Sequence, residues 1–299
     1  MEIYSHYSLT VCRLQADAPS LTHSSPMTDL PLLNRTAVIT GSTRGIGLIM
    51  AQALAAAGAN VVVSSRSETE VVCEQLSKDA IAKVIGITCD VTSLEQVEHL
   101  AAKTIEQFGQ IDIWINNAGI ASPYAQTLDI SAKRWKSVVE TNLYGTYHGT
   151  TVALKHMLER NQGKIINVFG AGDQDSRVDK YGYMSAYATS KSAVRRFTLV
   201  MAEEYRQIPI SILGLRPGLV ATDLMTKIEP FNEEAAQRLR GLNFALSLFT
   251  TSIEQIQSTI VEMASSTTDG VSGKVYRCRV TLPAIWQRWI QRSHSHQSE

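Results

Sequence analysis

The chain has 299 residues, of which 44% are hydrophobic, and its 28 Lys and Arg balance its 28 Asp and Glu. A net charge of zero provides no basic field for nucleic acid, and no apolar run approaches the roughly 18 residues that a membrane-spanning helix needs. The four cysteines are scattered without a C-x-x-C pair, as is typical of reduced thiols. We therefore expect a cytoplasmic protein with a core large enough for one α/β domain, with no nucleic-acid or membrane partner.

Residues 1–33 differ from the rest of the chain. They show neither a helical nor an alternating period, and they contain several Ser, Thr and Pro. They also lack the basic start and the continuous apolar stretch of a secretory signal. We expect a flexible N-terminal extension, and Met27, just ahead of the first predicted strand, is an alternative start of the native protein.

The first predicted unit joins a strand, a glycine turn and a helix. The apolar run Ala37–Thr40 predicts a buried strand, and Leu48–Ala57 predicts a helix that ends at Gly58. Between them the glycines have the spacing G-x-x-x-G-x-G rather than the commoner G-x-G-x-x-G. Backbone N–H groups at such a helix start can hold a pyrophosphate. The cofactor-binding residues predicted here are Gly41, Ser42, Arg44, Gly45, Ile46 and Gly47.

The end of the second predicted strand indicates which cofactor binds. NAD-specific dinucleotide folds place an acid there, about 20 residues past the glycines, to accept the ribose 2′-OH. This strand instead ends in Ser65 and Arg66. Together with Arg44 in the glycine turn, they offer two guanidinium groups and a hydroxyl for a 2′-phosphate. We therefore predict NADP (NADPH) as the cofactor.

Strand-like and helix-like segments alternate along the chain. Near-continuous apolar strands separated by helices predict a doubly wound, Rossmann-like α/β fold, in which a mostly parallel seven-stranded sheet carries helices on both faces. No linker marks a second domain, so residues 34–280 form one unit. The predicted strands are Ala37–Thr40, Val61–Ser64, Val84–Thr88, Ile111–Ile115, Lys164–Val168, Ile210–Leu215 and Lys274–Tyr276. The clearest helical patterns after the first helix are Leu94–Phe108, Trp135–Leu158 and Ala193–Tyr205.

Several polar or glycine-containing motifs follow the ends of these strands. The carboxyl ends of parallel strands form the edge that faces a ligand in a doubly wound sheet. We therefore expect cofactor contacts from Asp90 and Val91 after strand three, from the run Asn116-Asn117-Ala118-Gly119 after strand four, and from Pro217, Gly218 and Thr222 after strand six.

Tyr187 and Lys191 stand four residues apart in a helical pattern, so both side chains project from one face. A phenol beside an ammonium is an acid/base device, because the positive charge favours the phenolate. We expect Lys191 to lower the pKa of Tyr187 from about 10 toward working pH.

Taken together, these motifs resemble those of the short-chain dehydrogenase/reductase family, in its single-domain branch, over roughly residues 34–280. The glycine turn matches the family's cofactor turn, Asp90 its adenine contact, Asn117-Ala118-Gly119 part of its strand-four motif, and Pro217, Gly218 and Thr222 its nicotinamide-side loop. Asn142, Tyr187 and Lys191 match its catalytic residues. The resemblance implies reversible hydride transfer between NADP(H) and a small-molecule alcohol/carbonyl pair. Tyr187 would act as acid/base, Lys191 would bind the ribose and tune Tyr187, and Asn142 would hold a water relay.

One residue of the family's pattern is missing. The catalytic serine usually follows strand five, and Gly170 stands at that position when the alignment is made on Ile165–Val168. The run Phe169–Asp173 looks like that of a subgroup of bacterial reductases with Gly-x-Gly-Asp here. Asp173, Gln174 or Ser176 are alternatives for the missing hydrogen bond, and Gly170 would leave about a hydroxymethyl of extra volume.

Two functions remain open at this point. The first is an NADPH-dependent carbonyl reductase or dehydrogenase, and the second is a catalytically weak NADP-binding sensor or scaffold. Losing one donor to a developing oxyanion costs about 10²–10³ in rate, which leaves a usable enzyme and favours the first. The segment Leu224–Thr251 should cover the substrate but has no diagnostic motif.

Residues 281–299 form a C-terminal tail. Trp286 and Trp289 predict a short amphipathic helix that docks on its own domain or on a sister subunit of a homodimer or homotetramer. We expect His294 and His296 to be solvated, with no metal site.

Overall fold

The computed structural model describes residues 30–78, 80–173 and 182–278. Within them, one sheet has the strand order β3-β2-β1-β4-β5-β6-β7, and every neighbouring pair is parallel. The predicted Rossmann-like, seven-stranded sheet is thereby confirmed. Its strands are β1 (Thr36–Thr40), β2 (Asn60–Ser65), β3 (Val84–Thr88), β4 (Ile113–Asn116), β5 (Gly163–Val168), β6 (Ile210–Arg216) and β7 (Val275–Arg277).

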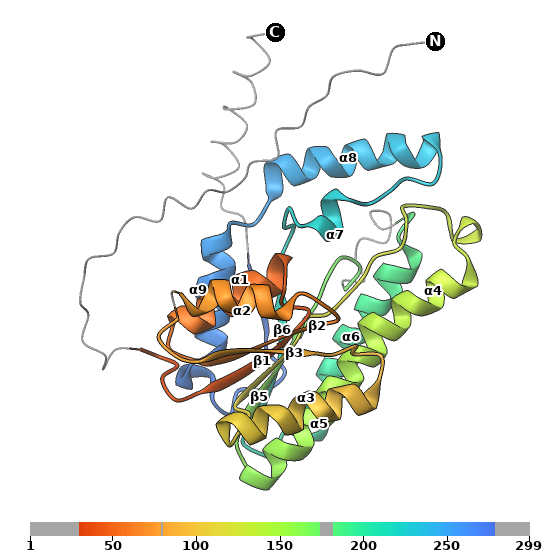
Figure 1. Ribbon diagram of the computed structural model, residues 1–299. Helices are drawn as coiled ribbons and strands as arrows, with labels where there is room; N and C mark the ends of the chain where they lie inside the picture. The colour runs from red at the N-terminus through yellow and green to blue at the C-terminus, as the bar shows by residue number, and fades with distance from the viewer. Residues whose placement is uncertain (1–29, 79, 174–181, 279–299) are drawn as a thin grey trace.

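Helices cover both faces of this sheet (Figure 1). Successive residues of a strand point to opposite faces, and here both faces are apolar. In β1, Ile39 packs with Met50 and Ile260 on one side, whereas Val38 packs with Leu100 and Val152 on the other. The first face is covered by α1 (Gly45–Ala56), α2 (Thr69–Ser77) and α9 (Ile253–Ala264), and the second by α3 (Leu94–Phe108), α5 (Gly145–Arg160) and α6 (Ser185–Glu204).

The remaining helices build the region beside the strand ends. Figure 1 shows α7 (Asp223–Thr226) and α8 (Glu233–Phe249) lying away from the two helical layers.

The predicted helix Trp135–Leu158 is divided in the structure into α4 (Ala132–Val139), a π-helical turn at Glu140–Tyr144, and α5. Such π turns frequently mark functional sites, and this one contains Asn142.

The last four residues of the expected N-terminal extension are attached to the folded domain through Leu30 and Leu32. Leu32 is fully buried, and its N–H donates to the carbonyl of Ala57 at 3.1 Å. Leu30 contacts the site where Gly58 would carry a side chain, because its Cβ lies 3.1 Å from that position. The expectations for residues 1–29 and for the C-terminal tail, with Met27, Trp286 and Trp289, lie outside the described residues.

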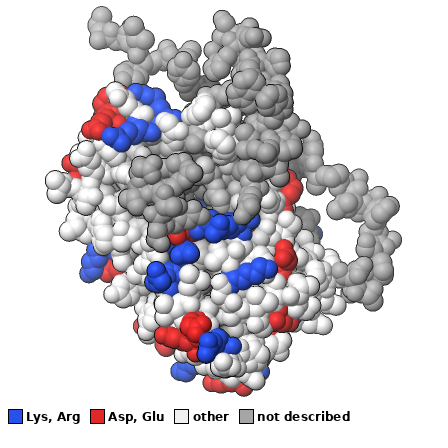
Figure 2. Space-filling view, turned by 180° about the vertical axis from the view of Figure 1, so that it is seen from behind, with Lys and Arg blue, Asp and Glu red and all other residues white. Residues whose placement is uncertain are grey.

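Basic and acidic side chains both occur on the face shown in Figure 2, without a continuous area of either sign. No helix in the described part of the chain is long and apolar enough to cross a membrane. Among the same residues, no group of three or more His, Cys, Asp or Glu is arranged to hold a metal ion.

Candidate functional site

The glycine turn after β1 is held in place by the motif that follows β4. The Asn117 side-chain amide donates to the carbonyls of Thr40 and Gly41, both at 2.9 Å. The Thr40 hydroxyl in turn accepts the N–H groups of Asn117 and Ala118, at 3.0 and 3.1 Å. The two motifs, 77 residues apart in the chain, therefore form one rigid corner.

The glycines of this turn are required by close packing. Gly41 has φ +64°, and a Cβ there would lie 2.8 Å from Ala118 Cα. A Cβ on Gly47 would lie 2.3 Å from the Gly41 carbonyl oxygen. Directly after the turn, α1 begins without an acidic residue in its first turn and without a side-chain cap at Arg44. Its N–H groups therefore remain available for an anion, as a pyrophosphate requires.

Some predicted cofactor residues use their side chains inside the protein. The Ser42 hydroxyl is fully buried and bridges β1 and β2, because it donates to Ile39 O at 2.7 Å and accepts from Ser64 N at 2.9 Å. Val91 is buried against α5, where a Cβ on Gly145 would lie 2.5 Å from Val91 Cγ2. Any cofactor contact from Ser42 or Val91 would therefore come from the backbone. Asp90 Oδ1 accepts from both the N–H and the hydroxyl of Thr92, which fixes the loop after β3.

The residues predicted to read the 2′-phosphate lie beside one another. Thr43 in the glycine turn donates its hydroxyl to Ser65 Oγ at 3.1 Å, so the end of β2 is joined to that turn. Arg44 and Arg66 follow these two residues directly, and both are exposed. Neither forms an ion pair among the described residues. Two unpaired guanidinium groups beside one short turn suit a phosphate ligand.

The loop after β6 closes the other side of the glycine turn. Gly218 has φ +79°, and a Cβ there would lie 2.3 Å from Thr251 Oγ1. Pro217, beside it, is buried. Thr222 contacts the glycine turn, since a Cβ on Gly45 would lie 3.3 Å from Thr222 Cγ2. The segments predicted to bind the pyrophosphate and the nicotinamide of the cofactor are thus brought together.

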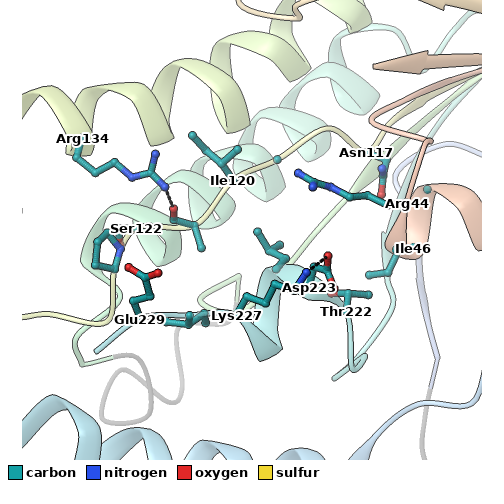
Figure 3. A pocket seen from close by; sticks show the side chains of 17 residues that line it. Arg44, Ile46, Asn117, Ile120, Ser122, Arg134, Thr222, Asp223, Lys227 and Glu229 are labelled. Carbon is teal, nitrogen blue, oxygen red and sulfur yellow. Dashed lines mark hydrogen bonds and ion pairs between the residues drawn. The ribbon is translucent and has the colours of Figure 1, made fainter. Parts of the chain in front are cut away.

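A cleft of about 480 Å³ lies between the glycine turn, the β4 loop and the α7 segment (Figure 3). Arg44, Ile46, Asn117, Gly119 and Thr222, all predicted from the sequence, line it. It also has lining residues that sequence reasoning missed, because no motif marks them: Ile120, Ser122, Arg134, Lys227 and Glu229. Figure 3 shows the Arg134 and Arg44 guanidinium groups entering the cleft from opposite sides. Lys227 is paired with Asp223 at 2.8 Å.

Asn142 connects the β4 loop to α6. It is fully buried, its Oδ1 accepts from Ile120 N at 2.8 Å, and its Nδ2 donates to Ile120 O at 3.0 Å and to Ser190 Oγ at 2.9 Å. Ser190 then donates to the Tyr187 carbonyl at 2.7 Å. A Cβ on Gly119 would meet Asn142 Oδ1 at 3.2 Å and Lys191 Nζ at 3.7 Å. Asn142 and Lys191 therefore meet at the end of the strand-four motif, and Asn142 is linked to the Tyr187 backbone through Ser190.

The expected lowering of the Tyr187 pKa by Lys191 is wrong for this structure. Tyr187 and Lys191 are both buried in α6, and burial disfavours the charged form of either group. Burial, together with the charge of Asp173, raises the pKa of Tyr187 to about 12. Burial lowers the pKa of Lys191 to about 8, and Asp173 opposes that change. The Lys191 ammonium donates to the carbonyl of Val168 at 2.9 Å.

Gly170 lies directly against the Tyr187 hydroxyl. A Cβ built on Gly170 would be 2.5 Å from Tyr187 Oη and 3.1 Å from Tyr187 Cζ. The expected extra volume at Gly170 is therefore not available, because the phenol itself fills it. On its other side, Tyr187 packs in an apolar cluster with Met184 and with Ala235 and Leu239 of α8.

Of the three alternatives to the missing serine, only Asp173 lies in the described residues. It is 4% exposed, and its carboxylate is engaged by Arg216, whose Nε donates to Oδ2 at 2.6 Å. This carboxylate is therefore committed to a guanidinium group. Gln174 and Ser176 lie outside the described residues.

The chain was compared with known proteins. A family model described as short chain dehydrogenase matches residues 35–233. The chain is 34% identical over 215 residues to a putative ketoacyl reductase of Streptomyces coelicolor, covering 68% of this chain and 80% of that protein. It is 30% identical over 210 residues to glucose 1-dehydrogenase 2 of Bacillus subtilis, covering 69% and 79%.

A third relative, the D-beta-hydroxybutyrate dehydrogenase of Cupriavidus necator, is 33% identical over 197 residues, covering 66% of this chain and 74% of that protein. Among solved structures, levodione reductase superimposes with a TM-score of 0.73 at 27% identity, covering 83% of this chain and 97% of that one.

Proposed function

Because the chain belongs to the short-chain dehydrogenase family and is an oxidoreductase for hydroxyl or carbonyl groups, we propose that it is an NADPH-dependent carbonyl reductase with Tyr187 as acid/base. The observation that carries this proposal is the convergence of Tyr187, Lys191 and Asn142 beside a glycine turn that fits a pyrophosphate. When bound, NADPH supplies the hydride for the carbonyl carbon.

Tyr187 donates the proton that the carbonyl oxygen needs once hydride arrives. The phenol is protonated at neutral pH, which is the form required of an acid, and its raised pKa extends that form to more alkaline pH. In alcohol oxidation the same group must first lose its proton, so burial favours the reductive direction. A positive charge brought next to the phenol would oppose this effect and lower its pKa.

Lys191 and Asn142 hold the site around Tyr187. The Lys191 ammonium is anchored on Val168 O and faces Gly119, where the ribose of the cofactor is expected. Asn142 fixes the β4 loop to α6 through Ile120 and Ser190. Both its side-chain atoms are engaged in these bonds, so in this structure it acts as a brace between the two elements.

NADP preference is supported by Arg44, Ser65 and Arg66 at the end of β2. No acidic residue stands at the end of this strand, and the first acid, Glu68, follows in the turn before α2. A carboxylate at Ser65 or Arg66 would repel a 2′-phosphate, whereas two guanidinium groups attract it.

We also infer a homodimer or a larger homo-oligomer. Tyr144 of the π-helical turn and Tyr147 of α5 are exposed, and the Tyr147 ring lies edge-on to the ring of Phe197 of α6, with 6.0 Å between the centroids. Val200, three residues after Phe197 in α6, is also exposed. An apolar strip on two neighbouring helices is typical of a self-association surface. Sedimentation velocity of the wild type and of Val200→Asp tests this, and a wild-type monomer would contradict it.

The proposed activity is tested by following NADPH oxidation with a panel of ketones, aldehydes and quinones. Turnover of any of these compounds that is lost in Tyr187→Phe supports the proposal. The alternative function, an NADP-binding sensor or scaffold, predicts tight NADPH binding without turnover of any compound in the panel.

A further inference from the structure

A buried ion pair that the proposed proton transfer does not use lies beside the catalytic helix. Arg216 Nε and Nη2 both lie 2.6 Å from Asp173 Oδ2, and the two side chains are 14% and 3% exposed. Taking two charges out of water is costly, and the attraction between them offsets that cost only in good geometry. A buried pair at this place therefore calls for a role beyond stability.

The pair joins two segments that border the reaction site. In the register of β5 and β6, Val168 lies opposite Leu215. Asp173 follows β5 at the end of the turn that begins with Gly170, and Arg216 stands directly before the Pro217-Gly218 loop. The ion pair thus ties the turn at the missing serine to the loop on the nicotinamide side.

The same turn is packed tightly on α6. A Cβ on Gly172 would lie 2.6 Å from Ala188 Cα, the Ser192 hydroxyl donates to the Gly172 carbonyl, and Asp173 N donates to Gly170 O at 3.3 Å. These contacts leave the turn little freedom. Gly170, at the start of this turn, is therefore held in a fixed position against the Tyr187 hydroxyl.

Several charged groups face Tyr187 or the ion pair. Lys191 lies one turn along α6 from Tyr187, Arg195 lies one turn further, and Arg277 lies opposite Arg216 in β7. The two additional arginines act on the Asp173 carboxylate together with Arg216. Asp173 is the negative charge that acts on Tyr187, where it adds to burial in raising the pKa of the phenol. It also favours the charged form of Lys191.

We propose that Asp173 and Arg216 form a positioning pair, which holds the Gly170–Asp173 turn against the Tyr187 hydroxyl and places a negative charge that disfavours the Tyr187 phenolate. This role rests on the proposed function of Tyr187. It explains how the site can position Tyr187 without the serine. The backbone turn Gly170–Asp173, held by the ion pair, fixes the position of the phenol instead. It also biases the enzyme toward carbonyl reduction, because alcohol oxidation requires the phenolate.

The test compares Asp173→Asn with Asp112→Asn. Asp112 is a matched control, because it is a buried carboxylate paired with Arg160 at 3.2 Å near the amino ends of the strands. Ionisation of Tyr187 is measured as tyrosinate absorbance in stopped-flow pH jumps, read before unfolding, with Tyr187→Phe in each background as the blank. We expect Tyr187 to ionise about one pH unit lower in Asp173→Asn and unchanged in Asp112→Asn. The acid limb of the pH–rate profile for alcohol oxidation should move to lower pH by the same amount in Asp173→Asn.

An unchanged Tyr187 ionisation in folded Asp173→Asn, or equal shifts in both variants, would overturn the proposal. If Asp173→Asn does not fold, Arg216→Lys is the second variant, because it keeps the positive charge but loses the Nε hydrogen bond to Asp173. Arg160→Lys is its control. Arg216→Lys should lower kcat about tenfold with unchanged NADPH affinity, and equal kcat values in the two Lys variants would overturn the proposal. The absorbance titration needs no turnover, so it decides between these outcomes even if an inactive wild type refutes the proposed function.

Discussion

The contact between Gly170 and Tyr187 makes a quantitative prediction. In Gly170→Ala the new methyl group would lie 2.5 Å from Tyr187 Oη, well inside van der Waals distance. Overpacking of this kind typically costs about 1–3 kcal/mol. In a Tyr187→Phe background the hydroxyl is absent, and the closest remaining contacts are 3.1 Å, to the ring carbon Cζ and to Lys191 Cγ. We expect the cost of Gly170→Ala to fall below about 1 kcal/mol there.

The measurement is a double-mutant cycle of unfolding free energies from urea titrations. Gly→Ala also restricts the unfolded chain, but this contribution is the same in both backgrounds and cancels in the cycle. Gly182→Ala is the matched control, because no described residue lies within 4 Å of its Cβ position. Additivity of Gly170→Ala and Tyr187→Phe to within about 0.5 kcal/mol would refute the conclusion that the phenol fills the serine position.

Three further predictions concern the cofactor, the acid/base residues and pH. Arg66→Asp should weaken NADPH binding by about 1.5–3 kcal/mol in a fluorescence titration, and equal wild-type affinities for NADH and NADPH would contradict the assignment of Arg66. Tyr187→Phe should abolish turnover at nearly unchanged cofactor affinity, whereas Lys191→Ala should lower both; retained turnover in Tyr187→Phe argues against the assignment. Since folding lowers the pKa of Lys191 to about 8 from 10.5, the folded state releases this proton first, and the unfolding free energy should rise between these pH values by up to about 3 kcal/mol. Denaturant titrations of Lys191→Met should lack this rise, and a rise of the same size there would refute the cause.

The fold and the packing of the β4 motif on the glycine turn were largely predictable from the sequence. The apolar strands and the glycine turn are local patterns, and the parallel sheet follows from their alternation with helices. The motifs after β4 and β6 were correctly placed beside the glycine turn, because parallel strands end at one edge of the sheet. Strand ends differ by one or two residues, as for β4, where a polar Asn116 continues the predicted strand.

The details around Tyr187 were not predictable in the same way. The π turn at Asn142 adds one residue to a helical period of 3.6, which a pattern over 24 residues does not resolve. The Asp173–Arg216 pair depends on the register of β5 against β6, which joins residues 43 apart. The pKa of Tyr187 depends on burial by α8 and the neighbouring turns, whereas the sequence showed only the nearby Lys191.

The central claim is that this site transfers hydride and that Tyr187 transfers the matching proton. It is tested most directly by incubating stoichiometric enzyme with NADPH carrying deuterium at both positions of the nicotinamide C4 and a carbonyl acceptor, and then analysing the alcohol by mass spectrometry. We expect one deuterium on the carbinol carbon with wild-type enzyme and none with Tyr187→Phe, although both bind NADPH equally. Deuterium transfer of the same extent in Tyr187→Phe, or none from wild-type enzyme to any acceptor, would contradict it.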